Sequence, residues 1–141
     1  MNQSFIDKTS IFQTRPKYSN EGKKKILQTF FEDRKIGQSL KPVVVTAYDL
    51  EARKPILISS YGDPEVTAVN AANASSAAPI YFPTASMEDG RWLIDGGIAT
   101  NNPSLLGYVE AKKIFSTDSI KVLGIGCLLY TSPSPRDLGK S

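Results

Sequence analysis

The feature that most constrains the fold is an alternation of strand-like and helix-like segments along the chain. Residues 43–45 (VVV) are β-branched and predict a buried strand. Residues 55–59 (PILIS) predict a second strand that pairs back onto the first as a hairpin. Residues 91–94 (RWLI) and 120–123 (IKVL) predict two more strands. Because helical segments are expected between the strands, the alternation predicts a layered α/β domain.

The first predicted helix covers residues 20–31, with Ser19 or Asn20 as its N-terminal cap. The lysine cluster at residues 23–25 is expected to lie on the outside of this helix, as a solvated face rather than a contact with an anionic surface. Apolar side chains at helical spacing predict the face that packs on the domain: Ile26, Leu27, Phe30 and Phe31.

A polar N-cap residue followed by proline is a favourable start for a helix, and this pattern predicts two further helices. Asp63 and Pro64 predict the start of one helix, and Asn102 and Pro103 predict the start of another that runs to about residue 115. The last helix is expected to bury Leu105, Leu106 and Val109.

Composition excludes several classes of protein. No run approaches the ~20 apolar residues of a membrane-spanning helix, and the polar start MNQSFIDKTS predicts no secretory signal. The net charge of +3 is mild and no basic stripe is interleaved with aromatic residues, so we expect no nucleic-acid partner. With no histidine and one cysteine, Cys127, the sequence holds no Ser-His-Asp or Cys-His machinery. We therefore expect no metal site built on histidine or cysteine, and no cofactor.

The last residues differ in character from the rest of the chain. Residues 127–137 (CLLYTSPSPRD) match, codon by codon, the translation of a transposase-type sequencing adaptor. The alternative is an ordinary proline-rich tail. We expect residues 1–126 to be the natural sequence, with a break after Gly126, and residues 127–141 to be a non-native tail.

Residues 93–104 (LIDGGIATNNPS) contain the strongest candidate site. Asp95 follows a short apolar strand, and partial burial there would make its carboxylate a stronger base. Glycines at positions 96 and 97 permit a positive φ or the close approach of another backbone. Taken alone, the motif leaves three alternatives open: a plain turn, an anion site at the helix start at Asn102, and a cation site formed by Asp95, Asn101 and Asn102.

Four stretches in this order resemble the C-terminal part of the catalytic domain of patatin-like phospholipases. They are residues 16–19 (PKYS), 43–50 (VVVTAYDL), 72–83 (ANASSAAPIYFP) and 93–103 (LIDGGIATNNP). The resemblance extends over roughly residues 14–126 and implies a partial three-layer α/β/α domain with a central sheet flanked by helices. It also implies a lipid acyl hydrolase, in which a serine of a Gly-x-Ser-x-Gly elbow attacks an ester and an aspartate of Asp-Gly-Gly acts as its base.

Carried onto this chain, the resemblance makes Asp95 the catalytic base and Gly96 and Gly97 the rest of its motif. A serine-aspartate dyad needs no histidine, which agrees with the composition. The resemblance implies no cofactor and a lipid ester as substrate. Because the sequence shows no signal peptide and no membrane span, we expect a location in the cytoplasm or at the periphery of a membrane, with peripheral contact to the membrane surface. The supporting turn and helix cap would be formed by Asn101, Asn102 and Pro103.

The sequence also departs from the family pattern. It contains no Gly-x-Ser-x-Gly and no glycine-rich loop for an oxyanion hole. Ser75 and Ser76 lie on a predicted helix rather than at an elbow, so we assign them to packing. We therefore expect this chain alone to be inactive. The alternative is a non-catalytic α/β module that binds a lipid or an anionic headgroup at the helix start at Asn102.

Overall fold

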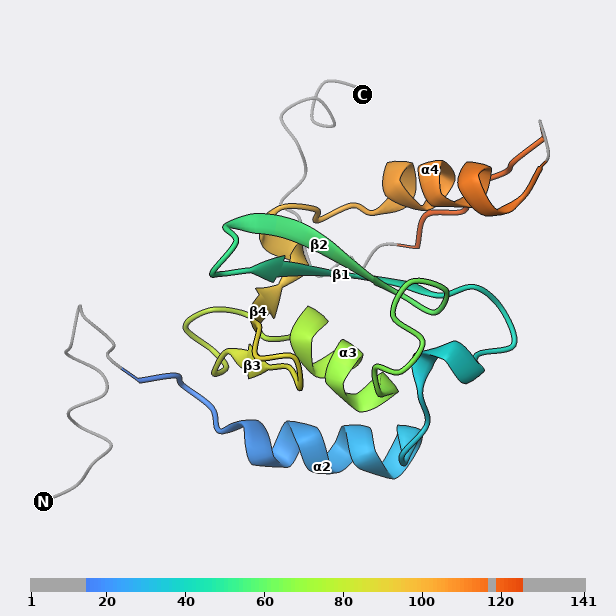
Figure 1. The fold of residues 1–141 in the computed structure, drawn as a ribbon. Coiled ribbons are helices and arrows are strands. Elements are labelled where there is room, and N and C mark those ends of the chain that lie inside the picture. The colour runs from blue at the N-terminus through green and yellow to red at the C-terminus, as the bar shows by residue number, and fades with distance from the viewer. Residues whose placement is uncertain (1–14, 117–118, 126–141) are drawn as a thin grey trace, which may run out of the picture. The chain divides into compact units, whose positions relative to one another are not determined.

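The computed structural model describes residues 15–116 and 119–125 (Figure 1). The chain forms two compact units, Met1–Asn101 and Asn102–Ser141. In chain order the described elements are α2 (Asn20–Phe31), η1 (Ile36–Gln38), β1 (Val44–Asp49), β2 (Lys54–Ser59), α3 (Ala68–Ser75), β3 (Ala85–Ser86), β4 (Trp92–Asp95), η2 (Gly96–Ile98) and α4 (Ser104–Ile114).

The strands of the first unit form one antiparallel sheet in the order β2-β1-β4-β3. β1 and β2 pair along their whole length, from Val44 opposite Ser59 to Asp49 opposite Lys54, so the predicted hairpin is confirmed. β4 pairs with the other edge of β1 and brings Asp95 opposite the buried Ala47.

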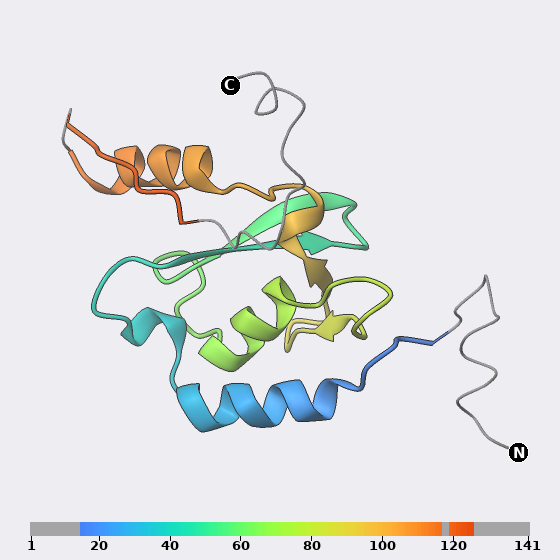
Figure 2. The same cartoon turned by 180° about the vertical axis from the view of Figure 1, so that it is seen from behind.

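Helices α3 and α2 are stacked on one face of this sheet, with α3 between the sheet and α2 (Figures 1 and 2). The small side chains of α3 allow this close packing, and Ala71 and Ala74 are buried against a core that includes Ile58 and Leu93. The combination of helices with a sheet confirms the predicted α/β class.

Helix α3 begins later than the sequence predicted. The carboxylate of Asp63 accepts a hydrogen bond from the N–H of Ser59 at 3.0 Å, so it is engaged by the end of β2 and does not cap a helix. Thr67 is the N-cap instead, and its Oγ1 accepts a hydrogen bond from the N–H of Asn70 at 3.2 Å. The predicted start at Asp63 and Pro64 is therefore wrong, because the side chain expected to cap the helix is occupied by a local contact with Ser59, four residues earlier.

Thr67→Ala is expected to lower the free energy of unfolding by about 1 kcal/mol, because it removes the acceptor for a helix N-terminal amide. Ser19 is a matched control: it is the N-cap of α2 but makes no side-chain hydrogen bond there. Ser19→Ala should therefore change the stability far less. Urea unfolding followed by circular dichroism measures both variants, and equal losses would contradict this account of the cap.

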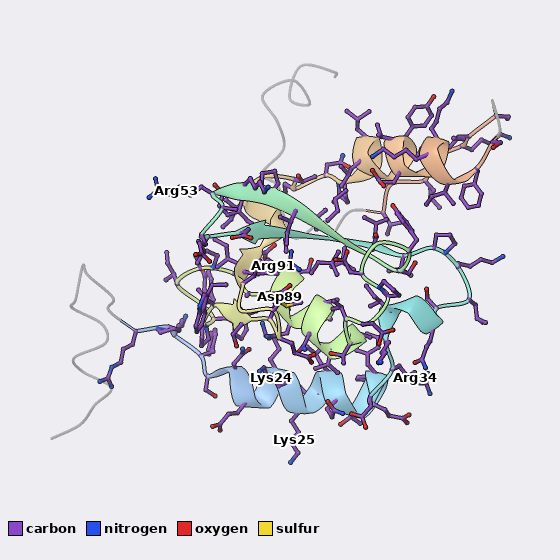
Figure 3. The ribbon with its side chains drawn as sticks, in the orientation of Figure 1. Lys24, Lys25, Arg34, Arg53, Asp89 and Arg91 are labelled. Carbon is purple, nitrogen blue, oxygen red and sulfur yellow. The ribbon has the colours of Figure 1, made fainter. Side chains whose placement is uncertain are left out.

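Helix α2 has the predicted bounds, but of the four residues predicted to pack on the domain only Leu27 is half-buried. Ile26 and Phe30 are 60% and 72% exposed, and no residue of α2 is buried. The half-buried residues are Asn20, Lys23 and Leu27, which follow one another at spacings of three and four positions and so share a face. Lys24 and Lys25 are exposed, and Lys25 points away from α3 (Figure 3). The lysine cluster is thus solvated at residues 24 and 25 but not at Lys23.

The second unit contains α4, which confirms a helix after Asn102 and Pro103. Its expected burial is wrong, since Leu105 is 74% exposed and Val109 42% exposed while Leu106 is half-buried. The strand expected at residues 120–123 is also wrong, because residues 119–125 carry neither helix nor strand. A strand needs a hydrogen-bonded neighbour, and the described part of this unit offers none. The predicted tail at 127–141 lies outside the described residues.

None of the helices formed by residues 15–116 and 119–125 has the length and apolar character that a bilayer span requires.

Candidate active site

Asp95 is the last residue of β4, and backbone contacts hold it on two sides. Its main chain lies opposite Ala47 of β1, and its N–H donates a hydrogen bond to the carbonyl of Ala77 at 3.1 Å. Leu93 and Ile94, which precede it, are buried, and Asp95 itself is half-buried. The strand therefore delivers the carboxylate to a fixed point between β1 and the segment that follows α3.

Gly96 is required by the close approach of β1. A Cβ at this position would lie 2.5 Å from the carbonyl carbon, the carbonyl oxygen and the Oγ1 of Thr46, which is far inside van der Waals contact. Among the described glycines only Gly90 has a positive φ. Gly96 is therefore not required for a left-handed backbone conformation, which was one of the two roles expected for the glycines of the motif. Its role is to bring the backbone after Asp95 against the backbone of β1.

Gly97 acts on the carboxylate itself. Its N–H donates a hydrogen bond to Oδ1 of Asp95 at 2.7 Å, which makes Asp95 the N-cap of the short helix η2. The other carboxylate oxygen, Oδ2, has no hydrogen-bond partner in the part of the chain that the structure describes. One oxygen is thus fixed in direction while the other remains open, an arrangement suited to accepting a proton from a positioned hydroxyl.

Lys23 is a neighbour of this site that the sequence analysis missed. Its Nζ donates hydrogen bonds to the carbonyls of Ser76 at 3.1 Å and Asn73 at 3.3 Å, and it lies 4.3 Å from the centroid of the Phe82 ring. Burial holds the pKa of the Lys23 ammonium below its usual value, while the negative charge of Asp95 raises it. The signal available in the sequence was the spacing of Lys23 and Leu27, which places the lysine on an inward face.

The polar side chains at the C-terminal end of α3 include Asn73, Ser75 and Ser76. Asn73 is 2% exposed, and its side-chain Oδ1 has no hydrogen-bond partner among the described residues. The hydroxyl of Ser76 donates to the carbonyl of Ala72 at 2.6 Å, an ordinary contact within one helical turn. Ser75 is half-buried on the same helix. Neither serine stands at a strand-to-helix elbow.

The other predicted site residues divide between the two units. Asn101 is exposed at the end of the first unit, whereas Asn102 and Pro103 begin the second. In the second unit, Oδ1 of Asn102 accepts a hydrogen bond from the N–H of Ser104 at 3.0 Å, so its side chain takes one of the free amides at the start of α4. Within the described residues no three acidic, histidine or cysteine side chains are grouped as metal ligands.

Comparison with known proteins places the chain in a family. The family model described as patatin-like phospholipase matches residues 1–106. Patatin-like protein 3 of Arabidopsis thaliana is 35% identical over 111 residues, which cover 70% of this chain and 26% of that protein. Patatin-like protein 2 of the same plant is 34% identical over 119 residues, covering 75% and 29%, and Patatin-2-Kuras 4 of Solanum tuberosum is 29% identical over 135 residues, covering 83% and 36%.

The chain therefore spans between about a quarter and a third of the length of these relatives. The match of the family model to most of the chain, with relatives above 30% identity, shows that the chain belongs to the patatin-like phospholipase family.

Proposed function

We propose that the complete protein is a lipid acyl hydrolase that cleaves an ester with a serine-aspartate dyad, and that Asp95 is the base of this dyad. Family membership supports hydrolysis of lipids in general terms. The observation that carries the finer proposal is the geometry of the carboxylate: one oxygen is held by the N–H of Gly97, and the other is open.

In the proposed reaction, the serine hydroxyl donates its proton to the open oxygen of Asp95 while the serine oxygen attacks the ester carbonyl carbon. The tetrahedral intermediate collapses, the bond to the alcohol breaks, and the departing alcohol takes up the proton from Asp95. A water molecule then loses a proton to Asp95 and attacks the acyl-serine, which releases the fatty acid and returns the proton to the serine. Backbone N–H groups would stabilise the oxyanion in both steps.

This 141-residue chain contains Asp95 but no Gly-x-Ser-x-Gly elbow, and a base without its nucleophile cannot form an acyl-enzyme. We therefore expect the purified chain to hydrolyse neither p-nitrophenyl esters nor phospholipids above the buffer rate. A longer chain that includes a strand, a Gly-x-Ser-x-Gly elbow and the following helix is expected to hydrolyse the same esters. Ester hydrolysis by the 141-residue chain that depends on Asp95 would contradict the assignment of the serine to another segment.

The second candidate is a non-catalytic module that binds an anionic headgroup at the start of α4. It has less support, because the side chain of Asn102 already accepts the N–H of Ser104 and so competes with an anion for that end of the helix. The coding sequence upstream discriminates between the two candidates. A serine elbow encoded there supports the hydrolase, and its absence supports the binding module.

A further inference from the structure

The C-terminal end of α3 is held by Lys23. The last carbonyls of a helix have no partner within the helix, and a cation near them is favourable. The ammonium of Lys23 donates to two such carbonyls, those of Asn73 and Ser76, across the interface between α2 and α3. Lys23, one of the three clustered lysines, therefore caps the C-terminal end of α3.

The same helix end holds Asp95. The carbonyl of Ala77, directly after that of Ser76, accepts the N–H of Asp95. Two consecutive carbonyls thus bind Lys23 on one side and the main chain of Asp95 on the other. A shift of the segment 76–77 would move Asp95 at the end of β4.

The two charges also interact through space. The carboxylate of Asp95 raises the pKa of Lys23, against the larger effect of burial, and the neighbouring Lys24 lowers it. Among the described residues Lys23 and Asp95 form no direct ion pair, so the ammonium does not occupy Oδ2 of Asp95. Contact with the Phe82 ring at 4.3 Å keeps the ammonium in this position.

We propose that Lys23 is a positioning residue for Asp95, which fixes the carbonyl segment that holds the aspartate and supplies a positive charge near its carboxylate. Its part in catalysis rests on the proposed function. Its coupling to Asp95 does not, and can be measured without a substrate.

The first test is competitive acylation of the lysine amines in the complete protein across a range of pH, with peptide mass spectrometry to read each lysine. Because the charge of Asp95 raises the pKa of Lys23, Asp95→Asn is expected to lower that pKa further and to speed acylation of Lys23 near neutral pH. The exposed Lys25 is the internal reference and should react at an unchanged rate. Equal Lys23 titration in both proteins overturns the proposal, whether or not the protein is a hydrolase.

The second test is steady-state ester hydrolysis by the complete protein. Lys23→Met is expected to lower kcat by roughly ten- to a hundredfold with little change in KM, since a small displacement of a catalytic group is costly. Lys23→Arg keeps the charge and the donors and should recover most of the loss, and Lys25→Met should leave turnover unchanged. Turnover of Lys23→Met equal to that of the unaltered protein overturns the proposal, as does a loss that Lys23→Arg shares in full. A protein that lacks hydrolysis from the outset contradicts the proposed function, and the acylation test still decides the coupling.

Discussion

Asp95→Asn in the complete protein is expected to lower kcat by roughly a hundredfold to ten-thousandfold, the usual contribution of a general base. The amide has the size of the carboxylate, and its oxygen can still accept the N–H of Gly97, which now holds Oδ1 of Asp95. The fold should therefore survive while the ability to accept a proton is lost. Saturation kinetics on a lipid ester measure kcat, and a thermal melt monitors the fold.

Asp49→Asn is the matched control for this experiment. Asp49 also ends a strand, is 4% exposed, and uses Oδ1 to accept the N–H groups of Glu51 and Ala52 in the turn between β1 and β2. Because this carboxylate stabilises the turn and is not assigned a part in the reaction, Asp49→Asn should keep the kcat of the folded protein. Unchanged turnover in Asp95→Asn, or an equal loss in Asp49→Asn, would remove Asp95 from the mechanism.

Gly96→Ala is expected to lower the free energy of unfolding by about 3 kcal/mol or more, because the added methyl overlaps the backbone of Thr46 and the strand cannot move aside. That is a large part of the stability of a typical domain. Chemical denaturation measures the loss, and a low yield of folded protein would be the first sign of it.

Two other glycines separate this steric effect from the general effect of adding a methyl group. Gly22 lies within α2 with open space around it, so Gly22→Ala should raise the stability by about 0.5–1 kcal/mol. At Gly97 a Cβ would meet Oδ1 of Asp95 at 3.1 Å. Gly97→Ala should therefore disturb the carboxylate more than the fold. Stability losses of similar size at positions 96 and 97 would contradict the close approach to β1 as the reason for Gly96.

Local signals in the sequence were sufficient for the β1–β2 hairpin and for the strand that ends at Asp95, but not for the short strand β3. The β-branched run at 43–45 needs only the next strand of the hairpin, which lies within the following 14 residues, and β1 pairs with that strand from Val44 to Asp49. The apolar residues before Asp95 and the glycines after it likewise predict a strand end and a turn, which Gly97 closes through its hydrogen bond to the Asp95 carboxylate. The partner that requires Gly96, Thr46 of β1, lies far away along the chain and could not be identified from the motif.

Features that depend on a distant partner could not be predicted in the same way. Periodicity identifies the faces of α2 but not which of them meets α3. The apolar face of Ile26 and Phe30 is exposed, while Lys23 turns inward because the carbonyls at the end of α3 accept its ammonium. The start of α3 moved from Asp63 to Thr67 for a similar reason, since backbone hydrogen bonds join residues 64–68 to the distant residues 34–37 and hold Pro64 and Val66 outside the helix.

The most direct measurement of the central claim is the rate at which a fluorophosphonate labels the nucleophilic serine of the complete protein. The probe forms a stable bond with an activated serine and requires the base but no product release. If Asp95 is the base, the unaltered protein should be labelled at one serine within a Gly-x-Ser-x-Gly elbow, and Asp95→Asn should be labelled at least about a hundredfold more slowly. Equal labelling rates in the two proteins would contradict the assignment of Asp95 as the base of the dyad.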